Sequence, residues 1–148
     1  FQVSGDISLN GIGLTLVDDY GHHPTEVEAV IQTARLVWPE QNLVMVYQPH
    51  RYSRTRDLFD DFVRVLSEVD TLILLEVYSA GETPIPGADS KALAQAIRQR
   101  GQVSPVYAQD PQEALSLLPS LVKDGEVLLV QGAGNVNVIS NSLRGAND

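Results

Sequence analysis

The chain has 148 residues, of which 43% are hydrophobic, and this length and composition predict one globular domain over residues 1–148. The formal net charge of −9 disfavours binding to nucleic acid, because contacts with phosphates need a basic surface, and the absence of cysteine excludes disulfides and thiolate metal sites. No stretch reaches the roughly 18 apolar residues of a membrane span, and the first residues lack the features of a signal peptide, so we expect a soluble, cytoplasmic protein.

Short apolar runs alternate with amphipathic segments along the chain. The runs are residues 14–17, 43–47, 71–77, 103–107 and 126–130. Because they are almost continuously apolar, they predict strands buried on both faces of a parallel sheet. The opening FQVSGDISLNG is punctuated by glycine and predicts an edge strand or hairpin. We therefore expect an α/β fold, a three-layer, Rossmann-like, doubly wound and mostly parallel sheet with this N-terminal strand or hairpin at its edge.

The segments between the strands predict helices. Residues 24–38 place apolar side chains at helical spacing behind a proline, and the segment from residue 55 to 69 carries a second apolar stripe. Asp89 and Asp110 have the residue type of helix N-caps. A last helix is expected over residues 135–143. The alternation of strands and helices is typical of βα units.

Four unusual polar loops follow predicted strands. They are DDYGHHP, QPHRYSRTR, YSAGETPIPGADS and QGAGN. Ligands of open parallel sheets bind beyond the carboxyl ends of the strands, where such loops converge. The loops expected at the opposite edge are ordinary polar turns. The sequence therefore predicts a binding site at the carboxyl edge of the sheet.

Basic residues gather in the second of these loops. Arg51, Arg54 and Arg56 lie within six positions of an otherwise acidic chain, at the start of a predicted helix. Guanidinium groups and a helix N-terminus both favour a carboxylate or phosphate ligand. The alternative is that these arginines pair with the aspartates that follow them on a solvated helix face, an interpretation that suits Arg56 best.

Two adjacent histidines stand in the first loop. His22 and His23 lack the i, i+4 spacing with which a helix presents two ligands to one metal ion, so we predict no metal site in this domain. His23 precedes a proline and suits a structural role at a helix start, which leaves His22 to face the cleft. A Ser-His-Asp triad built on Ser53 or Ser79 is disfavoured, because no Gly-x-Ser-x-Gly motif is present.

The last loop, QGAGN, stands between a strand and a helix, the usual place of a phosphate-binding loop. It lacks the third glycine of a dinucleotide fingerprint and the Gly-Lys-Ser/Thr ending of a P-loop. Its glycines also suit a simple tight turn. If this protein uses ATP, the phosphates must be held by another domain.

The motifs DDYGHHPTE, QPHRYSRTRDLFDDF, EVYSAGETPIPGADS and QGAGN occur in this order and resemble the C-terminal domain of the Mur ligases. The resemblance covers essentially the whole chain. It implies the third domain of an enzyme whose N-terminal UDP-binding and central ATPase domains are absent from this chain. A Rossmann-like fold is implied as well.

The same resemblance implies an ATP-dependent, amide-forming ligase of peptidoglycan synthesis. In the reaction, L-alanine is joined to the carboxylate of UDP-N-acetylmuramate through an acyl phosphate, with ATP and Mg²⁺ held mainly by the central domain. The isolated domain would then be inactive. A ligase of the same family that recycles murein tripeptide is the nearest alternative. A stand-alone nucleotide- or anion-binding module and a purely structural domain are alternatives from other classes.

Family positions imply roles for five residues. Asp19 matches the carboxylate that binds the ATP ribose. Tyr20 and His22 match residues beside the incoming amino acid. Arg51 and Arg54 match paired arginines near the alanine carboxylate. The resemblance implies no catalytic residue and no metal ligand in this domain alone.

Other residues are expected only to border the cleft. They are Ser79, Glu82, Gly132 and Gly134. The family also places an arginine immediately before the Phe-Gln of its first strand. Here Phe1 is the first residue, so this group is missing and nucleotide binding by the chain alone is in question.

Overall fold

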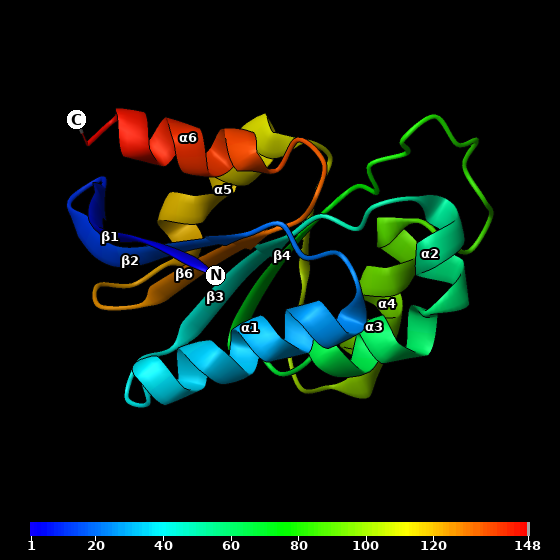
Figure 1. The fold of residues 1–148 in the computed structure, drawn as a ribbon, viewed down its shortest axis with the longest axis horizontal. Helices are drawn as coiled ribbons and strands as arrows, with labels where there is room; N and C mark the ends of the chain where they lie inside the picture. Colours follow the sequence, from blue (N-terminus) through cyan, green and yellow to red (C-terminus); the bar gives the residue numbers. More distant parts are fainter. Residues whose placement is uncertain (148) are drawn as a thin grey trace.

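In the computed structural model, which describes residues 1–147, one sheet lies between two layers of helices (Figure 1). The strands are β1 (Gln2–Leu9), β2 (Ile12–Asp19), β3 (Leu43–Tyr47), β4 (Thr71–Leu75), β5 (Val106–Ala108) and β6 (Val127–Gln131). Their spatial order is β1-β2-β6-β3-β4-β5, and only β1 and β2 pair antiparallel. The predicted mostly parallel sheet with an N-terminal hairpin is confirmed.

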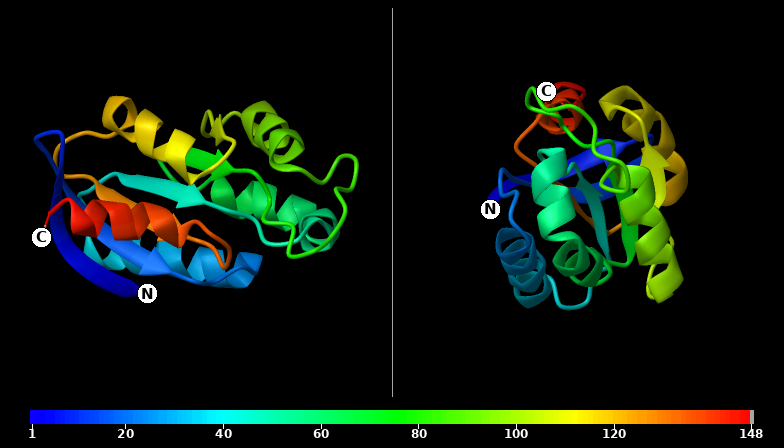
Figure 2. Two further views of the ribbon diagram at one scale, coloured as in Figure 1. Left: turned by 90° about the horizontal axis from the view of Figure 1, so that it is seen from above. Right: turned by 90° about the vertical axis from the view of Figure 1, so that its right-hand side faces the viewer.

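Helices cover both faces of this sheet (Figure 2). They are α1 (Pro24–Val37), α2 (Tyr52–Asp57), α3 (Phe59–Leu66), α4 (Ser90–Arg100), α5 (Pro111–Leu121) and α6 (Asn137–Gly145). One hydrophobic cluster joins α1, α3 and α4 to the sheet, and a second joins α5 and α6 to its other face. No helix within residues 1–147 combines the length and the apolar character needed to cross a bilayer.

The central strand β3 shows why its sequence is continuously apolar. Leu43, Met45 and Tyr47 belong to the cluster under α1, α3 and α4. Val44 and Val46 point the other way, into the cluster under α5 and α6. All five are fully buried. A strand covered on both faces has no position left for a solvated side chain.

Most elements lie within two residues of their predicted bounds, and the largest differences are in the arginine segment and in β5. The helical segment expected after Thr55 begins earlier, at Tyr52, and is broken at Leu58 into α2 and α3. Its first turn donates hydrogen bonds to Glu82 of a distant loop. The strand expected over residues 103–107 is shortened to β5, because Pro105 has no backbone N–H to donate to the sheet.

Candidate functional site

The loops that follow β2, β3, β4 and β6 meet at the carboxyl edge of the sheet. The Gly132 N–H donates to the Asp19 carbonyl at 3.1 Å, which joins the loop after β6 to the end of β2. The Arg51 N–H donates to the Tyr78 carbonyl at 2.8 Å, which joins the loops after β3 and β4. The four polar loops predicted to share one edge therefore lie side by side.

Three rings from these loops form a row. The His22 and His50 rings are 5.7 Å apart, and His50 stacks on Tyr78 with centroids 5.5 Å apart and planes inclined by 16°. Gly134 supports the far end of the row, because a Cβ atom there would lie 2.5 Å from Cγ of Tyr78. The second glycine of QGAGN is thus required for close packing against Tyr78.

His50 was not among the predicted site residues, and the structure places it in the middle of this row. Nη1 of Arg54 lies 3.2 Å from Nδ1 of His50 and 3.0 Å from its carbonyl oxygen. A guanidinium can only donate hydrogen bonds, so Nδ1 accepts and the proton of the neutral ring is on Nε2. Burial, and then the charge of Arg54, lower the pKa of His50. The ring is therefore a neutral donor at Nε2.

The three arginines of the motif have different surroundings. Arg51 is exposed, and within residues 1–147 its guanidinium makes no hydrogen bond or ion pair. Arg54 is half-buried against His50. Arg56 pairs with Asp57 at 2.9 Å on the exposed helix surface, as the ion-pair interpretation predicted for it. Arg51 is thus exposed without a partner among the described residues, Arg54 is held by His50, and Arg56 is held by Asp57.

The loop after β2 is organised by a helix cap. His23 is the N-cap of α1, and its Nδ1 accepts from the Thr25 N–H at 3.2 Å, which confirms its structural role. The Glu26 carboxylate accepts from the N–H groups of His22 and His23, and these bonds lower the pKa of Glu26. His22 is half-buried with no partner on Nδ1, and Tyr20 is 68% exposed.

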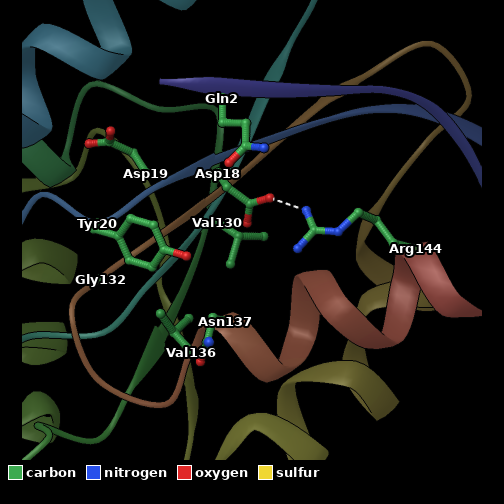
Figure 3. Close-up of a pocket in the computed structure, with 9 residues that line it drawn as sticks. All are labelled: Gln2, Asp18, Asp19, Tyr20, Val130, Gly132, Val136, Asn137 and Arg144. Carbon is green, nitrogen blue, oxygen red and sulfur yellow. Dashed lines mark hydrogen bonds and ion pairs between the residues drawn. The ribbon is translucent and has the colours of Figure 1, made fainter.

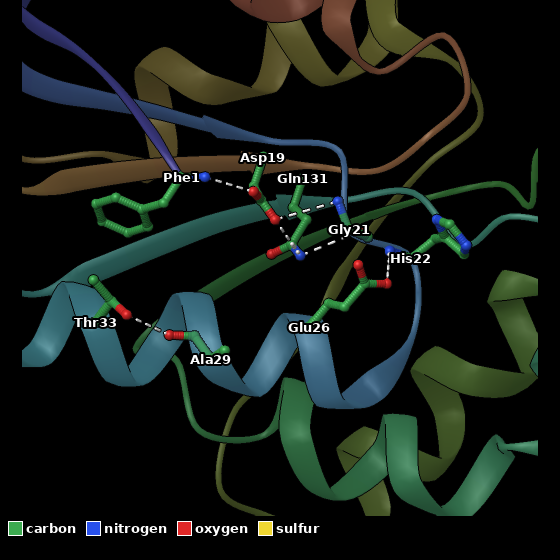
Figure 4. Close-up of polar contacts among 8 residues, drawn as sticks. All are labelled: Phe1, Asp19, Gly21, His22, Glu26, Ala29, Thr33 and Gln131. Carbon is green, nitrogen blue, oxygen red and sulfur yellow. Dashed lines mark hydrogen bonds and ion pairs between the residues drawn. The ribbon is translucent and has the colours of Figure 1, made fainter.

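Asp19 is the last residue of β2, and its carboxylate accepts several hydrogen bonds (Figure 4). Its carboxylate accepts from the Phe1 amino group at 2.7 Å, from the Gly21 N–H at 3.2 Å and from Nε2 of Gln131 at 3.3 Å. The Gln131 side chain is buried, and its oxygen has no partner within the described residues. A Cβ atom on Gly21 would lie 2.9 Å from the Asp19 carboxylate and 2.8 Å from Nε2 of Gln131. This network fixes the carboxylate at the cleft.

The neighbouring Asp18 points to the opposite face of the sheet, into a small pocket that Tyr20 also lines (Figure 3). Arg144 and Ser140 of α6 both donate to the Asp18 carboxylate. Gly132 borders the same pocket. Asp18 therefore holds α6 against the sheet, whereas Asp19 borders the same pocket but directs its carboxylate to Phe1, Gly21 and Gln131.

The loop after β4 carries two further predicted residues. The Glu82 carboxylate accepts from the Ser53 hydroxyl and, at 3.1 Å, from the Ser53 N–H. Ser79 is half-buried, and its carbonyl accepts from the Glu82 N–H at 3.0 Å. Ser53 therefore donates to a carboxylate and not to a histidine. Within residues 1–147 no three histidine or carboxylate side chains gather as a metal site.

Comparison with known proteins places these features in a family context. Residues 2–134 match the sequence model of a family described as "Mur ligase, glutamate ligase domain". The chain is 54% identical over 143 residues to the UDP-N-acetylmuramate–L-alanine ligase of Methylococcus capsulatus. That alignment covers 97% of this chain and 30% of the relative, so the chain spans less than a third of its length.

Solved structures show the same fold. The UDP-N-acetylmuramate-alanine ligase MurC from Thermotoga maritima matches with a TM-score of 0.71 and 22% identity, over 95% of this chain and 28% of that one. A domain of a Haemophilus ducreyi ligase matches with a TM-score of 0.65 and 19% identity, over 96% of this chain and 99% of that one. The second structure is of a single domain, and this chain covers nearly all of it.

Proposed function

This chain belongs to the Mur ligase family, as its C-terminal, glutamate ligase domain, and from this premise we propose that it presents the amino acid in an ATP-dependent ligase of peptidoglycan synthesis. The reaction joins L-alanine to the carboxylate of UDP-N-acetylmuramate through an acyl phosphate. The observation that carries the proposal is the 54% identity, over 97% of the chain, to a UDP-N-acetylmuramate–L-alanine ligase. The remaining domains of the complete protein are its partners.

The arginine motif is the proposed binding site for the alanine carboxylate. Arg51 presents an exposed guanidinium without an internal partner, and Arg54 brings a second positive charge. A carboxylate can accept hydrogen bonds from both guanidinium groups. His50 adds a neutral Nε2–H donor next to them, which contributes a hydrogen bond without competing for the proton of the substrate amine.

Tyr20 and His22 are the proposed neighbours of the amino acid on the other side of the cleft. His22 lies next to His50 in the ring row, and Tyr20 is largely exposed at the mouth of the loop. Both come from the loop held by the α1 cap, so their backbone is positioned before any ligand arrives. A positioned amine and carboxylate lower the entropic cost of amide formation.

Asp19 is the proposed ligand of the ATP ribose. A carboxylate at a strand end is suited to accept hydrogen bonds from ribose hydroxyls. In a longer chain the nitrogen of Phe1 is an uncharged peptide amide, so the ion pair with Asp19 would be lost and the carboxylate would be more available. ATP supplies the phosphoryl group that activates the muramoyl carboxylate, and its phosphates and Mg²⁺ are held by residues outside this chain.

The proposal is tested with the complete gene product, ATP, Mg²⁺ and UDP-N-acetylmuramate. ADP release is measured with L-alanine in one reaction and with murein tripeptide in the other. Release that depends on L-alanine is the expected result. ADP release only with the tripeptide would assign the domain to a recycling ligase. No ADP release with either substrate, together with tight anion binding by the chain alone, would favour a stand-alone module.

A further inference from the structure

Helix α2, which carries Arg54, lacks an N-cap of its own. Its N-cap position is Arg51, whose side chain makes no capping bond. The orphan donors at a helix start need a partner, because an unpaired N–H near the protein interior is costly. Glu82 provides that partner from the loop after β4, by accepting from the Ser53 N–H and hydroxyl. Glu82, which lies 29 positions after Ser53 in the chain, therefore caps α2.

The backbone at Arg51 is strained. Its φ of 73° and ψ of 135° lie in a region that residues with a Cβ atom rarely adopt. Three contacts hold it there. The Arg51 N–H donates to Tyr78, and the Arg51 carbonyl accepts from the N–H and hydroxyl of Thr55 at 3.2 and 3.0 Å. Strain of this kind persists only where the surrounding structure over-determines the conformation.

The backbone of the loop after β4 places Glu82 next to the start of α2. Ala80 and Gly81 both have positive φ, of 52° and 89°, and the Glu82 N–H closes the turn on the Ser79 carbonyl. The Tyr78 N–H also donates to the Pro49 carbonyl at 2.8 Å. The loop after β4 therefore contacts the arginine motif on both sides of Arg51, at Pro49 and at Ser53.

We propose that Glu82 is a positioning residue that keeps Arg51 and Arg54 in their anion-binding arrangement by capping α2 through Ser53. The inference rests on the proposed function, because it assigns those arginines to the amino-acid carboxylate. Each Glu82 oxygen accepts one hydrogen bond from Ser53, and these two bonds direct the carboxylate towards the start of α2. The bonds from Ser53 lower the pKa of Glu82, so it is ionised when it caps.

Steady-state kinetics of the complete ligase test this role with three variants. Glu82→Ala removes the cap and is expected to raise KM for L-alanine about tenfold, the effect of losing one hydrogen bond, while KM for ATP is unchanged. Glu82→Gln keeps the shape and one accepting oxygen, so it should remain close to wild type. Thr83→Ala, at an exposed neighbouring position, is the matched control and should have no effect.

Hydrogen exchange of residues 50–58, measured by mass spectrometry on the same preparations, gives a readout that is independent of activity. Faster exchange of this segment in Glu82→Ala, and wild-type exchange in Glu82→Gln, would support the cap. An unchanged KM for L-alanine in Glu82→Ala, or a loss in Glu82→Gln as large as in Glu82→Ala, would overturn it. If the wild-type enzyme shows no ligase activity, the proposed function fails, and unchanged exchange in Glu82→Ala would separately overturn the positioning role.

Discussion

Arg54 fixes both the ring and the backbone of His50, with one guanidinium nitrogen 3.2 Å from Nδ1 and 3.0 Å from the carbonyl oxygen of that residue. The contact selects the tautomer of His50 with its proton on Nε2. It also disfavours the imidazolium, because a second positive charge would face the guanidinium. A histidine beside two arginines therefore behaves as a neutral hydrogen-bond donor.

The first prediction concerns stability at acidic pH. The pKa of His50 is lowered from its ordinary value of 6.5, first by burial and then by Arg54, so the unfolded chain binds this proton more readily than the folded one. The stability that His50 contributes is therefore fully present above pH 6.5 and is lost as the pH falls towards its folded pKa. Thermal melts at pH 7.5 and 5.5 should show a smaller drop in melting temperature for His50→Asn than for wild type. Equal drops would contradict a half-buried His50 that stays neutral in the folded protein.

The second prediction separates Arg51 from Arg56. Arg51→Ala in the complete ligase should lower kcat/KM for L-alanine by about 10 to 100-fold, because a charge-assisted contact is lost, with little change in melting temperature. Arg56→Ala removes an equal charge from an exposed ion pair, a kind of contact worth about 1 kcal/mol or less, and serves as the control. A large loss of stability with activity retained would reject the substrate role of Arg51.

The third prediction concerns the glycine under the ring row. In Gly134→Ala the new Cβ would lie 2.5 Å from Cγ of Tyr78 and 2.6 Å from Oε1 of Gln48, so the Tyr78 ring must move. We expect destabilisation of about 1 to 3 kcal/mol in denaturant unfolding, the range for overpacking, and weaker binding of the amino acid. Gly145→Ala adds the same methyl group where no atom lies within 4 Å, and it should not destabilise the protein. Similar unfolding curves for both variants would show that the row tolerates displacement.

The fourth prediction contrasts two adjacent aspartates. Asp19→Asn in the complete ligase should raise KM for ATP with little effect on KM for L-alanine, because the ribose would lose a charged acceptor. Asp18→Asn weakens the contact with Arg144 and should lower the melting temperature while leaving KM for ATP close to wild type. The reverse pattern would move the nucleotide to the α6 side of β2.

The sequence alone is sufficient for the architecture and for the edge of the sheet at which the polar loops meet. The apolar runs predicted the strands because residues buried on both faces of a sheet leave no polar positions, as in β3. The polar loops predicted the carboxyl edge because parallel strands end together there. His23 was predicted as a structural residue because a proline follows it, and that relationship is local.

Tertiary structure decided the contacts within the site. Three features depend on which loops lie side by side: the tautomer of His50, the strain at Arg51 and the cap from Glu82. The spacing of residues along the chain does not show which loops become neighbours. The hydrogen-bond partner of the first turn of α2 also lies in another loop. Local patterns determine strands and helices through burial and hydrogen bonding within a few residues. Charge states and strained backbones are instead set by atoms that only the folded sheet brings within hydrogen-bond distance.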